Sequence, residues 1–315
     1  MKRKKLINRF LNVFGIELSR VNTGIFKNDY FDIPKPDISI KDGQVYFKKL
    51  SLTLPIKSAR PLIEGYQYAI KIVENLKGKF LYKNNELIAE IEEIRFFINE
   101  ADELFIINEV FVENCYNIIL PETNIIAIDI GMNVGITSLY LSAKKNVQKI
   151  YSYELFPPTF EHAVKNISLN PTGKKIIPHS YGWGSQNETL NLEYSAEEKG
   201  RMGLLGLPAD RKFKSTLLQS VEIKKASDEL TRLIEQNNEK MIVCKMDCEG
   251  AEYDIIEDLA SNNLLEKIAV YMIEWHFKDP RVICDMLEKK DFVVFCLTFQ
   301  SNDSGLIYAV KKNIN

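Results

Sequence analysis

Short apolar segments and amphipathic segments alternate along the chain from residue 124 onward. Apolar runs rich in β-branched residues predict strands at seven places, namely 125–129, 149–153, 175–179, 241–247, 268–274, 292–297 and 306–311. Apolar positions spaced three and four apart predict helices between them, at 135–145, 157–169, 226–237, 251–260 and 279–290. Strands and helices that alternate in this way build a parallel sheet with helices on both faces.

The last two predicted strands are joined differently from the others. Only residues 300–305 separate them, a loop too short for a crossover helix, so we expect this pair to run antiparallel. A seven-stranded, mostly parallel α/β sheet with an antiparallel last strand is the Rossmann-like class I methyltransferase arrangement. A standard dinucleotide fold keeps its sixth strand parallel instead. We therefore predict a class I fold for a domain at residues 121–315.

Residues 1–120 lack this alternation, and we interpret them as an N-terminal α+β accessory or substrate region. Residues 1–21 combine six basic side chains with a helical stripe of apolar ones. The favoured interpretation is a helix packed on its own domain, and the alternative is peripheral contact with an anionic membrane surface.

The rest of this region gives weaker patterns. Residues 61–79 are expected to be helical, with a proline in the first turn. The runs at 80–82, 87–98 and 105–111 suggest strands or a hairpin, although the middle run also fits a helix.

Composition narrows the class of protein. A net charge of −2 over 315 residues, with a pI near 6.1, gives no signature of nucleic-acid binding. The five cysteines have no repeated pair spacing, so we interpret them as reduced thiols of a cytoplasmic protein. No apolar run reaches the roughly 18 residues that a membrane span needs.

A glycine turn follows the first strand of the predicted sheet. Asp129 ends the strand, and Gly131 and Gly135 frame a turn that leads into a helix, where free backbone N–H groups favour an electronegative ligand. Glu154 ends the second strand, where a carboxylate accepts both hydroxyls of a ribose. The Gly-x-x-x-Gly spacing lacks the pattern of a pyrophosphate cradle, which disfavours NAD and ATP. Gly182 and Trp183 follow the third strand, and the indole packs either on a nucleobase or in the core.

Three further features follow along the chain. Residues 189–194 predict an extra strand. The glycine-rich segment 197–208 is either a lid over the pocket or a plain surface loop. Glu252 and Asp254 are expected to cap the helix that follows the fourth strand.

Charged side chains gather at the ends of the fourth and fifth strands. Strand alternation places Lys245 and Asp247 on one side, with Glu249 just beyond them, and it places Glu274 and His276 on a shared face. These strand ends meet at the edge of the sheet where α/β proteins bind ligands. We expect His276 to act as a general base, with Asp247 as the competing choice. A divalent metal held by these side chains is an alternative that we do not favour, because no defined ligand spacing is present.

Taken together, these motifs resemble the FkbM family of S-adenosylmethionine-dependent methyltransferases. The resemblance covers about residues 100–310. It is carried by the sequence from Asp129 to Gly135, by Glu154, by the block Lys-Met-Asp-Cys-Glu-Gly-Ala-Glu at 245–252, and by Glu-Trp-His at 274–276. The resemblance implies O-methylation, often of a sugar hydroxyl in a glycan, a glycolipid or a glycosylated metabolite. The acceptor is then a small molecule or a glycan, and residues 1–120 choose it.

The resemblance also implies roles for residues of this chain. Binding of S-adenosylmethionine is expected from Asp129, Gly131, Asn133, Gly135, Glu154, Leu155, Gly182, Trp183 and Asp247. Acceptor binding is expected from Glu249, Glu274 and Arg201, and catalysis from His276, Asp247 and Lys245. Two other functions stay open, an NAD-dependent oxidoreductase or epimerase and a non-catalytic methyltransferase-like scaffold in a glycan assembly complex. A homo-oligomer is compatible with the sequence.

Overall fold

The computed structural model describes residues 37–117, 124–195, 202–203, 216–237, 240–299 and 303–313. The chain forms two compact units, which are described separately below. The predicted helix at 1–21, Arg201, and the glycine-rich segment at 197–208 apart from Met202 and Gly203 lie outside the described residues. Within the described ranges, no helix is long and apolar enough to cross a membrane.

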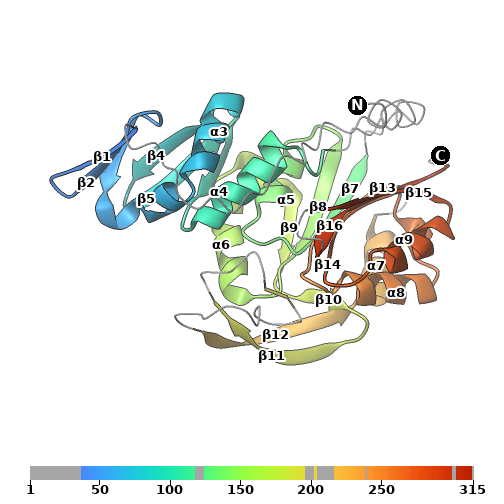
Figure 1. Cartoon of the computed structure of the whole chain (residues 1–315). Helices are drawn as coiled ribbons and strands as arrows, with labels where there is room; N and C mark the ends of the chain where they lie inside the picture. The colour runs from blue at the N-terminus through green and yellow to red at the C-terminus, as the bar shows by residue number, and fades with distance from the viewer. Residues whose placement is uncertain are drawn as a thin grey trace. The chain divides into compact units, whose positions relative to one another are not determined.

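The N-terminal unit contains two small antiparallel sheets and several short helices (Figure 1). The sheets are β1-β2-β3 and β4-β5-β6, with strands at Ile38–Lys41, Gln44–Phe47, Leu52–Pro55, Lys79–Lys83, Glu86–Ile91 and Ile94–Phe97. The helical elements are η2 (Ile56–Ser58), α2 (Arg60–Glu64), α3 (Tyr66–Leu76), α4 (Ala101–Ile107) and the π-helical turn η3 (Asn108–Val112). The run at 87–98 is therefore two strands of a hairpin and not a helix.

The prediction of a strand at 105–111 is wrong, because α4 and η3 cover these residues. The cause is a helix start just before them. Glu100 is the N-cap of α4, and it forms a reciprocal capping box with Glu103 three residues later. This box satisfies N–H groups of the first turn and fixes a helical period on a run whose apolar residues also fit a strand.

The second unit is built on a seven-stranded sheet in the order β15-β16-β14-β13-β7-β8-β9. Its strands are β7 (Ile125–Ile130), β8 (Val147–Tyr153), β9 (Ile176–His179), β13 (Met241–Met246), β14 (Val270–His276), β15 (Phe292–Thr298) and β16 (Ser304–Lys311). Strand β16 runs antiparallel to both β14 and β15, and the pairs from β9 to β14 are parallel. The predicted class I arrangement is confirmed.

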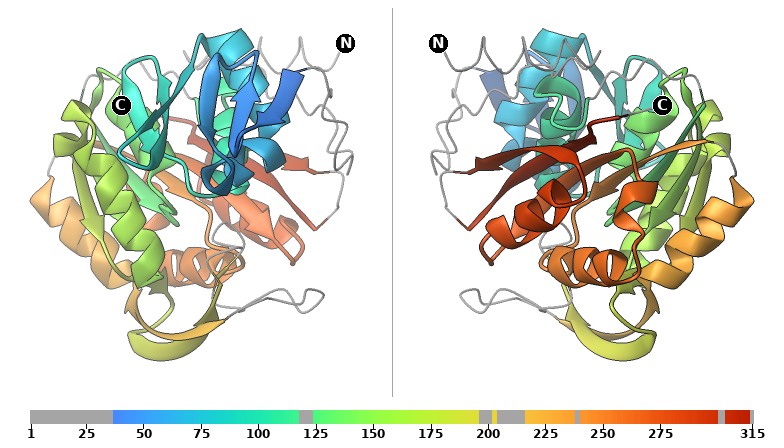
Figure 2. Two further views of the ribbon diagram at one scale, coloured as in Figure 1. Left: turned by 90° about the vertical axis from the view of Figure 1, so that its left-hand side faces the viewer. Right: turned by 90° about the vertical axis from the view of Figure 1, so that its right-hand side faces the viewer.

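Helices cover both faces of this sheet (Figure 2). On one face, α7 (Ala226–Gln236), α8 (Glu252–Ser261) and α9 (Arg281–Glu288) bury their apolar sides against the strands. On the other face, Ser138 of α5 (Ile136–Ser142) donates a hydrogen bond to Asp129 of β7. The other helical elements of this unit are α6 (Pro157–Ser168), η4 (Pro171–Lys175) and η6 (Leu265–Lys267).

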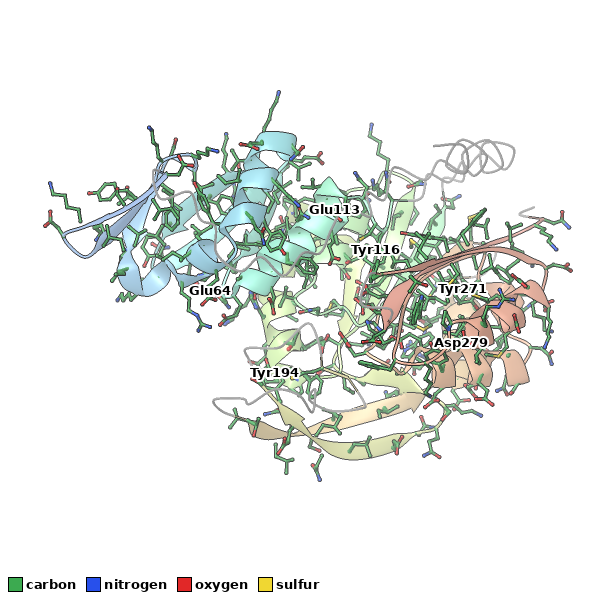
Figure 3. The ribbon with its side chains drawn as sticks, in the orientation of Figure 1. Glu64, Glu113, Tyr116, Tyr194, Tyr271 and Asp279 are labelled. Atoms are coloured by element: carbon green, nitrogen blue, oxygen red, sulfur yellow. The ribbon has the colours of Figure 1, made fainter. Side chains whose placement is uncertain are left out.

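A second, three-stranded sheet in the order β10-β12-β11 extends from this unit (Figure 1). It contains β10 (Gly182–Gly184), β11 (Glu188–Tyr194) and β12 (Leu217–Lys225). The expected extra strand at 189–194 is β11, whereas β12 was not predicted. Tyr194, labelled in Figure 3, fixes the end of β11, because its hydroxyl lies 3.3 Å from that of Thr159 in α6.

Candidate functional site

The glycine turn after β7 takes its shape from backbone contacts. Gly131 has φ +78°, and a Cβ atom at this position would overlap the carbonyl oxygen of Asp247. The N–H groups of Gly131 and Met132 both donate to the carbonyl of Tyr153, at 3.0 and 2.8 Å. Gly135 has φ +86° and is the N-cap of α5. The turn therefore joins the ends of β7, β8 and β13 into one edge.

A row of buried polar side chains supports this turn from within the sheet. The strand register places Ser152, Asp129 and Lys245 side by side on β8, β7 and β13. The Lys245 Nζ lies 3.2 Å from Asp129 Oδ1 and donates to the carbonyl of Gly131 at 2.6 Å. Ser138 donates to the other oxygen of Asp129 at 2.5 Å. Both oxygens of the Asp129 carboxylate therefore contact groups inside the protein, Lys245 on one side and Ser138 on the other.

This arrangement changes the expectation for two residues. Asp129 is 0% exposed and does not line the cavity described below, so the structure offers it no direct contact with a ligand there. Lys245 is 2% exposed, and the pKa of its ammonium is raised because Asp129 and Asp247 outweigh the effect of burial. Lys245 therefore stays charged and contacts the turn through the carbonyl of Gly131.

Glu154 is the carboxylate that does face the cavity. Its two oxygens accept hydrogen bonds from the N–H groups of Asn133 and Phe156, at 2.8 and 3.0 Å. Burial raises the pKa of Glu154 to about 7, and these two backbone donors oppose that rise. A carboxylate held in place by backbone donors, with lone pairs left over, is suited to accept hydroxyl groups of a ligand.

Aromatic residues form the wall beside Glu154. The Trp183 indole is 2% exposed, and its ring lies edge-on to that of Tyr153 with centroids 5.1 Å apart. Trp183 belongs to the main apolar cluster and also lines the cavity, so both interpretations of this residue apply. Its Nε1 and the Tyr153 hydroxyl are buried without a hydrogen-bond partner. Buried donors without partners are uncommon, and a ligand or a water molecule in the cavity would satisfy them.

These elements enclose a cavity of about 590 Å³, a volume that includes its open mouth. This volume lies within the ~300–1,000 Å³ typical of small-molecule sites. Of the residues predicted from the sequence, eight line it: Gly131, Asn133, Glu154, Leu155, Gly182, Trp183, Asp247 and Glu249. Five others do not: Asp129, Gly135, Lys245, Glu274 and His276. The prediction for Arg201 lies outside the described residues.

An acidic cage lies at the ends of β13 and β14; we define it as Asp247, Glu249 and Glu274 around the Nε2 atom of His276. The three carboxylates approach this atom to 4.0, 3.9 and 3.7 Å. Burial raises the pKa of Glu249 to about 8, and burial together with Glu274 also raises the pKa of Asp247.

His276 itself is 6% exposed. Burial alone would lower its pKa, but Glu252, Glu274 and Glu249 outweigh that effect and raise the pKa to about 12. An imidazole in this setting holds its proton near neutral pH. His276 is not among the residues that line the cavity, whereas the competing choice for the general base, Asp247, is one of them.

Three residues that were not among the expected site residues also contribute to the site. Met202 and Gly203 line the cavity, and a Cβ atom on Gly203 would lie 2.6 Å from the carbonyl oxygen of Cys248. The glycine-rich composition of 197–208 was the available signal. Glu252, which we had interpreted as a helix cap, is 0% exposed and accepts from the N–H groups of Cys248 and Gly250 at 2.7 and 2.8 Å. It shapes the loop that carries Asp247 and Glu249.

Comparison with known proteins places this site in a family. The model of the methyltransferase FkbM domain matches residues 129–294, which is more than half of the chain. The chain is 26% identical to the methyltransferase sdnD of Sordaria araneosa over 233 residues, covering 66% of this chain and 90% of that protein. It is 27% identical to methyltransferase 1 of Beauveria bassiana over 229 residues, again covering 66% and 90%.

Among solved structures, a methyltransferase FkbM from Methylobacillus flagellatus is similar with 10% identity and a TM-score of 0.39. The similarity covers 64% of this chain and 47% of that one, so the chain spans about half of that structure. The matched domain model contains the glycine turn, Glu154, the 245–252 block and the acidic cage. The chain belongs to the FkbM family of methyltransferases.

Proposed function

We propose that this protein transfers a methyl group from S-adenosylmethionine to a hydroxyl group, most specifically that of a sugar in a glycan, a glycolipid or a glycosylated metabolite. One observation carries the proposal. A single cavity joins a backbone turn and a ribose-type carboxylate, Glu154, to a carboxylate that can take up a proton, Asp247. The acceptor class follows from the family resemblance.

The residues of the cavity fit the donor. Gly131 leaves room where any side chain would collide, Glu154 offers acceptors to the ribose hydroxyls, and Trp183 offers an apolar face and an unpartnered N–H to the adenine. Asn133 and Gly131 present backbone at the methionine end. When bound, S-adenosylmethionine supplies a methyl group that is activated by the positive charge of its sulfonium.

The chain then has two tasks, to align the acceptor hydroxyl and to take its proton. Asp247 lines the cavity, and its side chain is 31% exposed, so it can reach a hydroxyl from the edge of the sheet. The Lys245 ammonium lies 3.7 Å from the Asp247 carboxylate, and this ion pair orients Asp247. Glu249, also on the lining, is assigned to hydrogen bonds with the acceptor. Alignment of the reacting atoms supplies a further share of the rate.

The N-terminal region, residues 1–120, is assigned to acceptor choice, and residues 121–315 to donor binding and methyl transfer. This division rests on the family match, which begins at residue 129.

The test begins with calorimetric titration of the full chain with S-adenosylmethionine, S-adenosylhomocysteine and NADH. We expect binding of the first two and none of NADH. Incubation with methyl-labelled S-adenosylmethionine and extracts of cell-surface glycan precursors then identifies the product by the label. Binding of NADH alone, or label incorporated at a nitrogen, would contradict the proposal. A chain that binds no donor would be a scaffold.

A pair of matched variants makes the titration specific. Glu154→Gln removes the carboxylate charge at the cavity, and Glu161→Gln makes the same change at an exposed position of α6. Only the first should weaken binding of the donor.

A further inference from the structure

The Nε2 atom of His276 points into the acidic cage without a hydrogen bond. Its distances to the three carboxylates, 3.7 to 4.0 Å, are longer than the roughly 2.7–3.2 Å of a hydrogen bond. The side chain is nevertheless more than nine-tenths buried. Glu252 bonds this imidazole at Nδ1, 3.2 Å away.

Glu252 fixes which nitrogen of the ring faces the cage. Its carboxylate already accepts from the N–H groups of Cys248 and Gly250, so it acts as an acceptor toward His276 as well. The ring therefore carries a hydrogen on Nδ1, and Nε2 faces Asp247, Glu249 and Glu274. A cation bound at Nε2 would replace the second proton that the ring otherwise holds there. A carboxylate that holds the far nitrogen of an imidazole is the usual support of a histidine that ligates a metal.

Charge around the ring is unbalanced. Four carboxylates approach His276, while Lys245 on the neighbouring strand is shared between Asp247, Asp129 and the carbonyl of Gly131. Half-buried carboxylates at these distances repel one another unless a cation lies between them. A second proton on the ring supplies one positive charge, and a divalent ion supplies two.

The distances favour an ion. Ligand atoms bonded at about 2.1 Å to one metal lie roughly 3.0–4.2 Å apart, depending on the angle between the bonds. The spacings from Nε2 to the three carboxylates fall in this range. One ligand atom each from Asp247, Glu249 and His276 lie within 4.8 Å of one another. The three spacings from Nε2 therefore fit ligands around a shared centre, and the carboxylate oxygens need only a small shift to do so as well.

We propose that the acidic cage binds one divalent cation, through Nε2 of His276 and carboxylate oxygens of Asp247 and Glu249, with Glu274 as a fourth ligand. Oxygen ligands with a single imidazole suit Mg²⁺ or Mn²⁺. Asp247 and Glu249 also line the cavity, so an ion here would reach an acceptor hydroxyl and stabilise its negative charge as the proton leaves. This catalytic role, though not the binding itself, rests on the proposed function.

The test uses the full chain after treatment with a chelator, with Mn²⁺ as the probe. Free Mn²⁺ is followed by its electron paramagnetic resonance signal. We expect one saturable site per chain, weakened at least tenfold in His276→Gln and in Glu249→Gln. Glu222→Gln is the matched control, because this exposed residue of β12 carries the same charge, and it should bind as the unmodified chain does. Circular dichroism shows whether each variant is folded.

A spectroscopic measurement on the unmodified protein does not depend on any variant. Electron spin echo modulation of bound Mn²⁺ should show coupling to an imidazole nitrogen. No saturable site, no nitrogen coupling, or equal affinity in all variants would overturn the proposal. Donor titration in the presence of chelator is scored separately. Mn²⁺ binding without donor binding therefore contradicts only the proposed function, and the reverse contradicts only the cation site.

Discussion

The two halves of the site are built in different ways. At the ends of β7 and β8, the chain uses backbone N–H groups, a glycine without room for a side chain, and one carboxylate, Glu154. At the ends of β13 and β14, it uses the imidazole of His276 and four carboxylates that each lie within 4.0 Å of a ring nitrogen. The first half offers a ligand shape and hydrogen bonds, and the second concentrates charge. If the proposed function holds, donor binding and proton removal should be altered separately by variants of the two halves.

Lys245 connects the two halves, and its loss should have the largest effect. Lys245→Met leaves the buried carboxylate of Asp129 without its cation, which we expect to cost about 4 kcal/mol of stability. Denaturant unfolding measures the change. Lys312→Met is the matched control, because its ion pair with Asp291 is exposed, and it should cost less than about 0.5 kcal/mol. The double variant with Asp129→Asn should recover part of the loss, and strict additivity would contradict this account.

A substitution at Gly131 tests the half of the site at the ends of β7 and β8, which relies on backbone groups. Gly131→Ala sets a Cβ against the Asp247 carbonyl at a positive φ, and we expect a cost of about 3 kcal/mol, seen as about a hundredfold weaker donor binding. Gly43→Ala shares the positive φ but meets no atom within 4 Å, so it isolates the effect of backbone strain. Similar donor affinity in both variants, measured by calorimetry, would show that the close approach is unimportant.

Asp247 tests the charged half. Asp247→Asn should lower the rate of label transfer about a hundredfold, while the dissociation constant of the donor changes only a few-fold. Asp254→Asn, at an exposed position of α8, is the control of equal charge and should keep its activity. An equal loss of turnover and donor affinity would assign Asp247 to donor binding instead.

The smallest expected effect is a pH dependence of donor binding. Glu154 must be ionised to accept the ribose hydroxyls, and its pKa is about 7, so donor affinity should fall about tenfold from pH 8 to pH 6. Calorimetry over this range measures the fall, which should be absent in Glu154→Gln. A pH dependence that persists in this variant would implicate another group.

The carboxyl group of Glu154 should also make the free energy of unfolding depend on pH, in the opposite direction to donor affinity. The ordinary pKa of Glu154 is 4.5, so between about pH 4.5 and 7 the folded chain holds a proton that the unfolded chain has lost. Stability from this group therefore falls as pH rises through that window, by about 3 kcal/mol in all. The unfolding free energy of the unmodified chain relative to Glu154→Gln should show this slope.

The two halves also differ in how far the sequence predicts them. The turn at 129–135 and Glu154 are recognisable because a glycine spacing and a strand end are local features. The surroundings of Asp129 and His276 are not local features. The register that aligns Asp129 with Lys245, and the loop that brings Glu252 to His276, are tertiary contacts.

The sequence by itself determined the alternation of strands and helices, the antiparallel last strand and the glycine turn at 129–135, because hydrophobic period, loop length and glycine spacing act over a few residues. The prediction of a strand at 105–111 was wrong because the apolar pattern there fits a strand or a helix, and the capping box at Glu100 and Glu103 starts a helix. The tertiary structure alone decided which carboxylates surround His276 and that Lys245 lies beneath the turn. Such contacts join residues of different strands, and their distances depend on strand order and register, which no local pattern encodes.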